Sequence, residues 1–330
     1  TDGIVSGNII SNASGNYTIS FLTGTHTITP QLENPSYFNV SPASATVTFP
    51  TTASPFIQDF CITPNSVYHD LETVIIPLIP ARPGFDATYK VKYKNKGNTI
   101  ETATLVLDYV DASSDYVLST IAPTSQSKGK LFWNLGTITP FESGEMVITM
   151  NVNSPMETPA VNGGDILSLI ASINGLNTDE TLLDNTFALR QIVVNSFDPN
   201  DKTCLEGNTI NPRMIGEYIH YKIRFENTGT YAAQNIVVKD VIDTTKFDVS
   251  TLQMTDASHS CVTRITDPDK VEFIFENINL PFDDANNDGY VVFKIKTKPT
   301  LVVGDIISNF ANIYFDYNFP IVTNTEMSTF

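Results

Sequence analysis

Two stretches of the sequence have nearly the same pattern: GFDATYKVKYKNKG at Gly84–Gly97 and GEYIHYKIRFENTG at Gly216–Gly229. In each stretch aromatic and aliphatic residues alternate with polar ones, many of them basic. Alternation with period two is typical of a half-buried β-strand whose rings pack inward while its lysines stay in water. The two stretches therefore predict strands that each border an apolar core.

The similarity between these stretches extends further along the chain. GDILSLIASI at Gly164–Ile173 matches GDIISNFANI at Gly304–Ile313, and Thr139-Pro140-Phe141 corresponds to Leu280-Pro281-Phe282. The matches keep their order, so the chain carries two tandem copies of one module, at 64–196 and 197–330. This period is too long for a thin solenoid repeat, so each copy is expected to have its own hydrophobic core. The prediction is all-β, with tandem immunoglobulin-like antiparallel β-sandwiches.

The sequence that precedes the first copy differs from both copies. Two short runs, Ser14–Phe21 and Gly24–Pro30, are separated by a turn with glycine and predict a hairpin, and Ala45–Phe49 predicts another strand. Residues 51–63 are rich in Thr, Ser and Pro and are expected to form a linker. Residues 1–50 would then be a separate, partial β module.

Composition restricts the possible partners. The 330 residues carry 19 Lys and Arg against 36 Asp and Glu, a net charge of −17. Nucleic acid and anionic lipid surfaces both require cationic clusters, so neither is expected as a partner. Divalent cations and neutral ligands remain open. No run approaches the length of a membrane helix, so no membrane insertion is expected, and the start of the chain does not resemble a signal peptide.

One loop has the composition of a calcium site. Asp284, Asn286 and Asp288 alternate before Gly289, and Tyr290 could add its backbone carbonyl. Calcium takes six to eight oxygen ligands, and such a loop can supply several of them. The twelfth position is Ile295, where an EF-hand has a bidentate Glu. The alternative is a plain hairpin turn, because Asn-Asp-Gly is a strong turn signal by itself.

Two further segments have both a functional and a structural interpretation. Asp198 and Asp201, between the copies, could bind a cation that stiffens the junction, but capping of turn amides is favoured. The aromatic run around Asp316 and Asn318 could stack on a sugar ring. The favoured interpretation is the last strand of a sandwich, with its rings in the core.

Signals for catalysis are lacking in the sequence. The four histidines are scattered and none lies in a metalloprotease motif, and no nucleophile elbow, phosphate-binding loop or dinucleotide fingerprint occurs. Three cysteines leave at least one thiol without an intramolecular partner. A bridge between Cys204 and Cys261 and buried, inert thiols are both compatible with this count. No catalytic residue and no bound cofactor other than calcium is expected.

Two runs resemble signatures of large secreted proteins of Bacteroidota. They are NSFDPNDK at Asn195–Lys202 and IYFDYNFPIVTN at Ile313–Asn324. In that family, tandem immunoglobulin-like repeat modules lie just upstream of a C-terminal sorting domain that directs export by the type 9 secretion system. Residues 1–50 are similar to the last strands of a carboxypeptidase-regulatory-like, transthyretin-type module. The resemblance implies an extracellular, secreted or surface-attached location and a fragment of a longer protein. Its implied partners are the type 9 secretion machinery and upstream domains of the same protein.

These observations predict a non-catalytic spacer or presentation stalk near the C-terminal end of a secreted bacterial protein. Two alternatives stay open. The chain could be an adhesin or glycan-binding module, with calcium or without it, or it could be an accessory part of a secreted hydrolase whose catalytic domain lies upstream.

Overall fold

The computed structural model describes residues 7–12, 14–195, 199–266, 268–283 and 286–330. Regular structure in these ranges consists of β-strands and one 3₁₀ turn at Pro212–Met214, so the all-β prediction is confirmed. None of the described residues forms a helix with the length and hydropathy needed to cross a membrane. The chain divides into two compact units, one comprising Ser20–Ser196 and the other comprising Phe197–Phe330 together with Thr1–Ile19.

The unit Ser20–Ser196 contains two antiparallel sheets, which we call the first sandwich. One sheet has the strand order β6, β7, β12, β9, and the other has the order β10, β11, β8, β13, β14. The strands are β6 (Leu71–Pro77), β7 (Asp86–Asn95), β8 (Glu101–Tyr109), β9 (Ser114–Ser119), β10 (Ser125–Ser127), β11 (Lys130–Ile138), β12 (Ser143–Val152), β13 (Ile166–Asn174) and β14 (Thr186–Ile192).

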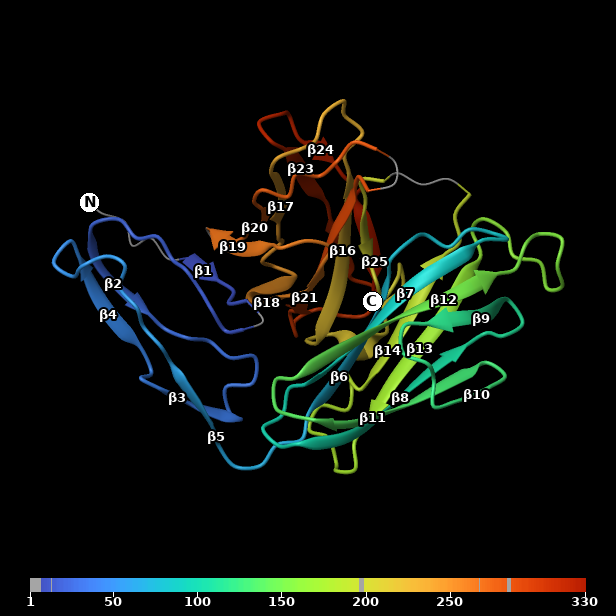
Figure 1. Cartoon of the computed structure of the whole chain (residues 1–330), viewed down its shortest axis with the longest axis horizontal. Coiled ribbons are helices and arrows are strands. Elements are labelled where there is room, and N and C mark those ends of the chain that lie inside the picture. The colour runs from blue at the N-terminus through green and yellow to red at the C-terminus, as the bar shows by residue number, and fades with distance from the viewer. Residues whose placement is uncertain (1–6, 13, 196–198, 267, 284–285) are drawn as a thin grey trace. The chain divides into compact units, whose positions relative to one another are not determined.

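The second sandwich, in the other unit, repeats this order strand for strand. One sheet has the order β15, β16, β21, β18, and the other has the order β1, β19, β20, β17, β23, β24, in which β1 (Gly7–Ile9) is an additional edge strand (Figure 1). The strands are β15 (Lys202–Cys204), β16 (Tyr218–Glu226), β17 (Ile236–Val241), β18 (Phe247–Ala257), β19 (Val262–Thr266), β20 (Lys270–Phe275), β21 (Asp288–Thr297), β23 (Ala311–Phe315) and β24 (Ile321–Val322). A further pair joins β22 (Ile306–Asn309) to β25 (Glu326–Thr329). The duplication seen in the sequence is therefore a duplication of topology.

Each sandwich buries an aromatic and aliphatic core between its sheets. In the second, Phe225, Phe273 and Phe293 are fully buried, and the rings of Phe273 and Phe293 stack with centroids 5.2 Å apart. Trp133, the only tryptophan in the sequence, is 1% exposed in the first. Rings of this size dominate the burial energy of a sandwich core.

One packing detail recurs in both copies. Gly144 pairs across the sheet with Tyr93, and Gly289 pairs with Phe225. A Cβ on Gly144 would lie 2.2 Å from the Tyr93 hydroxyl, and a Cβ on Gly289 would lie 2.1 Å from the Phe225 ring. In each copy the ring covers a glycine, so the residue opposite the ring cannot carry a side chain.

The substitution Gly289→Ala is expected to lower the free energy of unfolding of the second sandwich by about 1–3 kcal/mol, because the buried Phe225 ring must move. Gly144→Ala should cost less, since Tyr93 is only half-buried and can shift toward solvent. Urea unfolding followed by near-UV circular dichroism measures the first change, and Trp133 fluorescence measures the second. An equal cost for both would contradict this account.

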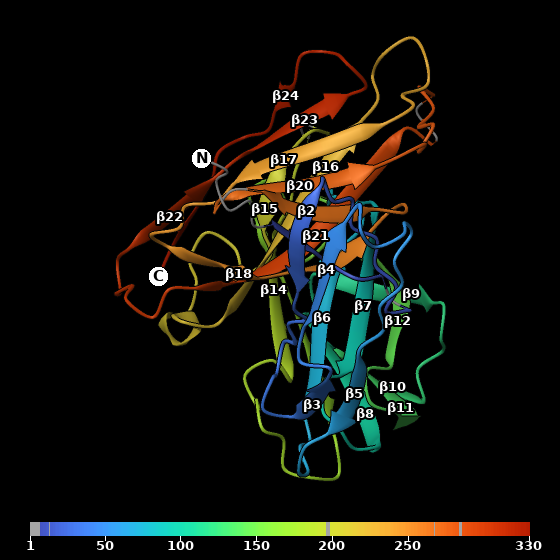
Figure 2. The same cartoon turned by 90° about the vertical axis from the view of Figure 1, so that its left-hand side faces the viewer.

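For the N-terminal part of the chain, as far as Pro64, the sequence predicts one partial module and a linker. In the structure the strands of this part form separate pairs instead. β1 (Gly7–Ile9) pairs antiparallel with β19 at the edge of the second sandwich. β2 (Gly24–Ile28) pairs with β4 (Ala45–Phe49), and β3 (Phe38–Ser41) pairs with β5 (Cys61–Pro64) (Figure 2). An edge strand offers unpaired N–H and C=O groups, and β19 satisfies them with β1. The corresponding edge strand of the first sandwich, β10, is only three residues long, and all three are exposed.

Candidate functional site

Three polar side chains lie in the apolar interior of the second sandwich. Lys202 is on β15, the first strand of the sandwich, Asp240 is on β17 and Asn309 is on β22, and they are 0%, 1% and 5% exposed. The Lys202 Nζ contacts Asp240 Oδ2. It also lies 4.7 Å from the ring centroid of Tyr221 and 5.3 Å from that of Phe293. The lysine therefore crosses from one sheet to the other through an aromatic environment.

These polar groups are incompletely satisfied. Within the described part of the chain, Asp240 Oδ1 and Asn309 Nδ2 are buried and have no hydrogen-bond partner of normal geometry. Burial raises the pKa of the Asp240 carboxyl, although Lys202 and the nearby Asn309 amide oppose this rise. Burial also lowers the pKa of the Lys202 ammonium, although Asp240 acts in the opposite direction. A low dielectric disfavours both charges and so favours the neutral amine and the neutral acid.

The first sandwich has apolar residues at all three corresponding positions. Val91 and Ile223 occupy the same place in the repeated stretches, and their partners are Ile75 and Lys202. In the alignment of Gly164–Ile173 with Gly304–Ile313, Leu169 corresponds to Asn309.

The third correspondence follows from the alanines two residues further along these runs. The alanine of the first copy, Ala171, pairs with Leu107, whereas Ala311 pairs with Asp240. Leu107 therefore corresponds to Asp240. Ile75, Leu107 and Leu169 are 0%, 0% and 3% exposed. These runs align in the sequence, so the positions at which an apolar residue of the first copy is replaced by a polar residue in the second are the signal that identifies the three residues.

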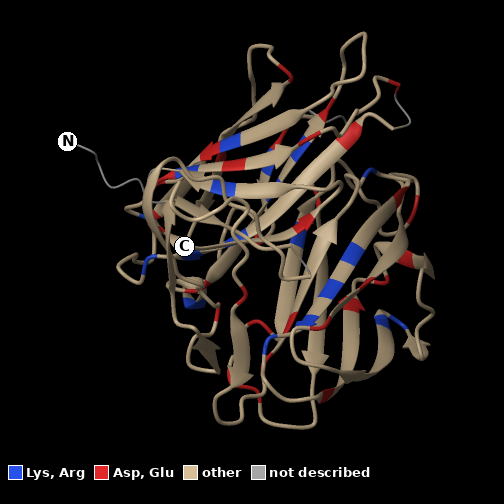
Figure 3. Ribbon diagram, turned by 60° about the vertical axis from the view of Figure 1, so that its left-hand side comes forward, with Lys and Arg blue, Asp and Glu red and all other residues tan. Residues whose placement is uncertain are grey.

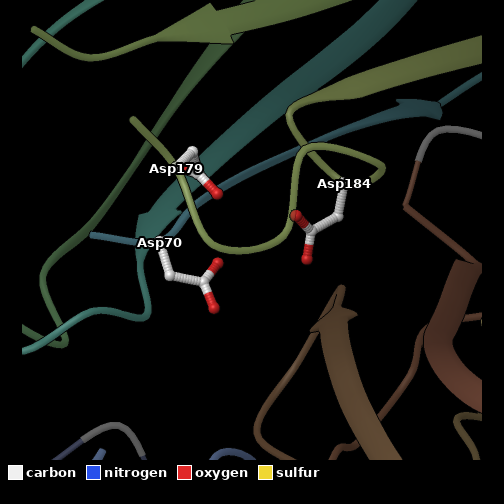
Figure 4. Close-up of side chains that lie close together, drawn as sticks. All are labelled: Asp70, Asp179 and Asp184. Carbon is white, nitrogen blue, oxygen red and sulfur yellow. The ribbon is translucent and has the colours of Figure 1, made fainter. Parts of the chain in front are cut away.

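A second polar cluster lies in the first sandwich. Single ligand atoms of Asp70, Asp179 and Asp184 lie within 4.8 Å of one another, and Figure 4 shows the three carboxylates close together. The Lys96 ammonium offsets part of the negative charge of the cluster: it contacts Asp184 and lies 3.4 Å from Asp70 Oδ1. Asp179 Oδ2 accepts hydrogen bonds from the Leu71 N–H at 2.7 Å and from Asn185 at 3.0 Å. The cluster thus fastens the loop before β14 to the start of β6.

Negative charge exceeds positive charge around Lys96. Burial alone lowers the pKa of the Lys96 ammonium, but the charges of Glu72, Asp184, Glu33 and Asp70 raise it above its usual value. The pKa of Asp184 is raised to about 7, chiefly by burial; Lys96 opposes the rise, and Glu72 and Asp70 add to it. The cluster therefore takes up a proton near neutral pH.

The free energy of unfolding of the variant Asp184→Asn, relative to that of the wild type, is expected to increase as the pH rises. Between its unfolded pKa of 3.8 and its folded pKa of about 7, Asp184 binds a proton in the folded state only, so wild-type stability falls as the pH increases through this window. The variant lacks this loss.

Urea unfolding followed by Trp133 fluorescence at about pH 5 and about pH 8 measures the effect. Between these two pH values, the free energy of unfolding of the variant relative to the wild type should increase by about 1 kcal/mol or more. One pKa unit corresponds to an energy of about this size. Asp108→Asn, at a surface ion pair with Lys130, is the control. A pH-independent difference for Asp184→Asn would contradict the assignment.

The predicted calcium loop is described except for Asp284, which lies outside the described residues together with Ala285. Asn286 donates to Asp283 Oδ1 at 3.2 Å, and Asp288 begins β21. The Tyr290 carbonyl, predicted as a ligand, accepts hydrogen bonds from the Ser258 N–H at 3.0 Å and from its Oγ at 3.3 Å. The Tyr290 hydroxyl donates to Asp256 at 2.8 Å. Calcium binding here stays a prediction.

That prediction is tested by melting the chain in EDTA and in millimolar calcium. A calcium loop requires a higher melting temperature in calcium, because a ligand that binds only the folded state stabilises it. Asp288→Asn should abolish the shift, and magnesium serves as a control for ionic strength. Equal melting temperatures in EDTA and calcium would retire the calcium prediction and leave the hairpin turn.

The aromatic run near the C-terminus departs from the favoured interpretation. Phe315 is buried, but Tyr317 and Phe319 are 104% and 96% exposed, on the turn between β23 and β24. The turn is fastened to a neighbouring loop, since Asp316 accepts hydrogen bonds from the N–H groups of Gln234 and Asn235 at 3.2 Å and 2.8 Å. The prediction that these rings lie in the core was therefore wrong for two of them. The period-two alternation ends at Phe315 because the next residue, Asp316, has a positive φ of 52°.

The junction and histidine residues have structural partners. Asp201 forms a bidentate ion pair with Arg224, with Oδ1–Nε and Oδ2–Nη2 both 2.6 Å, which fastens the residue before β15 to β16. Asp198 lies outside the described residues. His220 pairs with Glu206 at 2.8 Å and His69 with Glu101, whereas His26 stacks on Phe21 and His259 bonds to Ser258. The three thiols are free.

The charged surface is mixed. Lysine and arginine recur as separate bands along strands rather than gathering in one place (Figure 3). An open hollow of about 340 Å³ lies in the first sandwich. Its lining is Tyr109, Asp111, Asp115, Tyr116, Gln126, Ser127 and Lys128, a set without histidine or cysteine.

Comparison with known families identifies one match. Residues 198–329 match a family described as Domain of unknown function (DUF7619). This range covers the second sandwich, so the similarity is to that part of the chain. No curated protein matches the sequence.

Several solved structures resemble the chain distantly. The C-terminal domain of the AgI/II polypeptide BspA from Streptococcus agalactiae is 10% identical, with 78% of this chain and 100% of that domain covered and a TM-score of 0.25. The C-terminal domain of the antigen I/II-family protein AspA from Streptococcus pyogenes is 11% identical, with coverages of 81% and 100% and a TM-score of 0.27. The BSP domain of a biofilm associated protein is 8% identical, with coverages of 81% and 60% and a TM-score of 0.33. At these scores the likenesses carry no argument about the role of this chain.

Proposed function

We propose that this chain is a non-catalytic extracellular spacer that holds neighbouring domains of a bacterial surface or secreted protein in position. The observation that carries the proposal is the repetition of one sandwich topology in two compact units. Each sandwich uses its aromatic residues to fill its own interior, as a module that folds around its own core must.

The placement of the reactive side chains supports the same function. Each histidine has a local hydrogen-bonding or stacking partner, and two of them are paired with a glutamate. The conspicuous carboxylate cluster surrounds its own lysine. The Ser258 hydroxyl, which lies 2.8 Å from His259 Nδ1, also accepts a hydrogen bond from the Tyr290 N–H at 2.8 Å and donates one to the Tyr290 carbonyl at 3.3 Å, so it fastens its loop to β21. These contacts stabilise strands and loops.

The resemblance of Asn195–Lys202 and Ile313–Asn324 to signatures of Bacteroidota proteins supports a finer proposal. The chain would be part of a cargo of the type 9 secretion system and would lie upstream of a sorting domain. Its acidic net charge of −17 favours solubility in an exported module.

The exposed rings favour a second candidate function, that of an adhesin. Tyr317 and Phe319 project from a turn held by Asp316, and Tyr231 on the loop between β16 and β17 is 83% exposed. Figures 1 and 2 both show this loop and the β23–β24 turn at the same end of the second sandwich. Exposed rings on well-anchored loops can stack on sugars or enter an apolar pocket of a protein.

The spacer function is tested by displaying the chain on bacteria between a membrane anchor and an epitope. The chain should make the epitope accessible to a large antibody, whereas the epitope attached directly to the anchor should be shielded by the cell surface. A glycan array probed with the purified chain should give background signal. Reproducible binding that disappears in the double variant Tyr317→Ala, Phe319→Ala would instead establish the adhesin function.

A further inference from the structure

We propose that Lys202 and Asn309 form an intramolecular isopeptide bond, with Asp240 as the proton carrier that promotes it. This would be a covalent link between the first strand of the second sandwich and β22, close to the end of the chain. The inference rests on three buried side chains and does not depend on the spacer function.

The position of Lys202 suits a nucleophile. Its amine is fully buried, touches a single carboxyl group and lies against two aromatic rings. An amine attacks a carbonyl carbon only in its neutral form, and desolvation in an apolar site favours that form. Transfer of the ammonium proton to Asp240 yields a neutral amine beside a neutral acid, which this environment tolerates better than an ion pair.

Asn309 suits the electrophile. Its side chain is near the Asp240 carboxyl, so the amine and the amide meet at the same acid. Its Nδ2 has no hydrogen-bond partner of normal geometry in the described part of the chain, so no protein group holds the nitrogen that must leave. The unpartnered Asp240 Oδ1 is a second site at which that acid can exchange a proton.

The reaction balances without any other reagent. The Lys202 Nζ lone pair attacks Asn309 Cγ, and protonated Asp240 donates its proton to the amide oxygen as the tetrahedral carbon forms. Asp240 then takes a proton from Nζ and passes it to Nδ2, and as the C=O bond reforms the hydroxyl returns its proton to Asp240. The Cγ–Nδ2 bond then breaks and ammonia departs. The products are one Nζ–Cγ amide and one ammonia, and Asp240 returns to its starting form.

Comparison with the first sandwich indicates that Lys202, Asp240 and Asn309 do not have a purely structural role. The first sandwich keeps Ile75, Leu107 and Leu169 at the corresponding positions, so the topology does not require polar groups there. A buried ion pair is often no more stabilising than apolar residues of similar size, and an unsatisfied buried amide has a net cost. Three polar replacements that meet at one point are more simply explained by chemistry among them.

The intact mass of the purified chain under denaturing conditions tests the proposal. We expect a mass lower than that of the sequence by one ammonia, and the full sequence mass for Lys202→Arg and for Asn309→Ala. Tryptic digestion should give a branched peptide in which residues 191–213, uncut at Lys202, are joined to residues 297–330. Near-UV circular dichroism of Lys202→Arg checks that this variant keeps the fold.

Three results would overturn the proposal. One is a wild-type chain at the full sequence mass. Another is the loss of water in place of ammonia, which would join Lys202 to Asp240. The third is a loss of ammonia that persists in Lys202→Arg, because succinimide formation at Asn162–Gly163 or Asn174–Gly175 also releases ammonia.

Discussion

Two antiparallel sheets packed face to face bury the side chains between them, and most features of this molecule follow from that constraint. Side chains that point inward must be apolar, or they must satisfy one another. The first sandwich keeps its polar cluster at the end of its sheets, where Asp70 and Lys96 meet the loop before β14. The second places Lys202, Asp240 and Asn309 in the core itself. The same topology thus tolerates two very different interiors.

Much of the fold could be predicted from the sequence because alternation reports directly on burial. Tyr89, Val91, Tyr221 and Ile223 lie at alternating positions of strands whose inward faces are buried, and the duplicated runs occupy corresponding strands. The pairing of β1 with β19 could not be predicted. So short a strand carries little pattern, and its partner lies near the other end of the chain. Such a pairing depends on the geometry of an edge that forms only after folding.

The sites were less predictable than the fold for a related reason. Asp284, Asn286 and Asp288 attract attention because calcium ligands cluster in sequence, whereas Lys202, Asp240 and Asn309 are separated by long stretches and meet only in the folded core. Tyr317 and Phe319 continue an aromatic run, and the reversal of the chain at Asp316 places them outside the sandwich. Hydrophobicity alone does not reveal where a strand stops.

The short outer strand β10 has a consequence for how such molecules tolerate crowding. Its three residues, Ser125, Gln126 and Ser127, are exposed, polar and too few to template a long ladder. Neighbouring copies at high local concentration would find little there to join into a continuous intermolecular sheet. A high density of this protein therefore carries a low risk of fibrous aggregation through that edge.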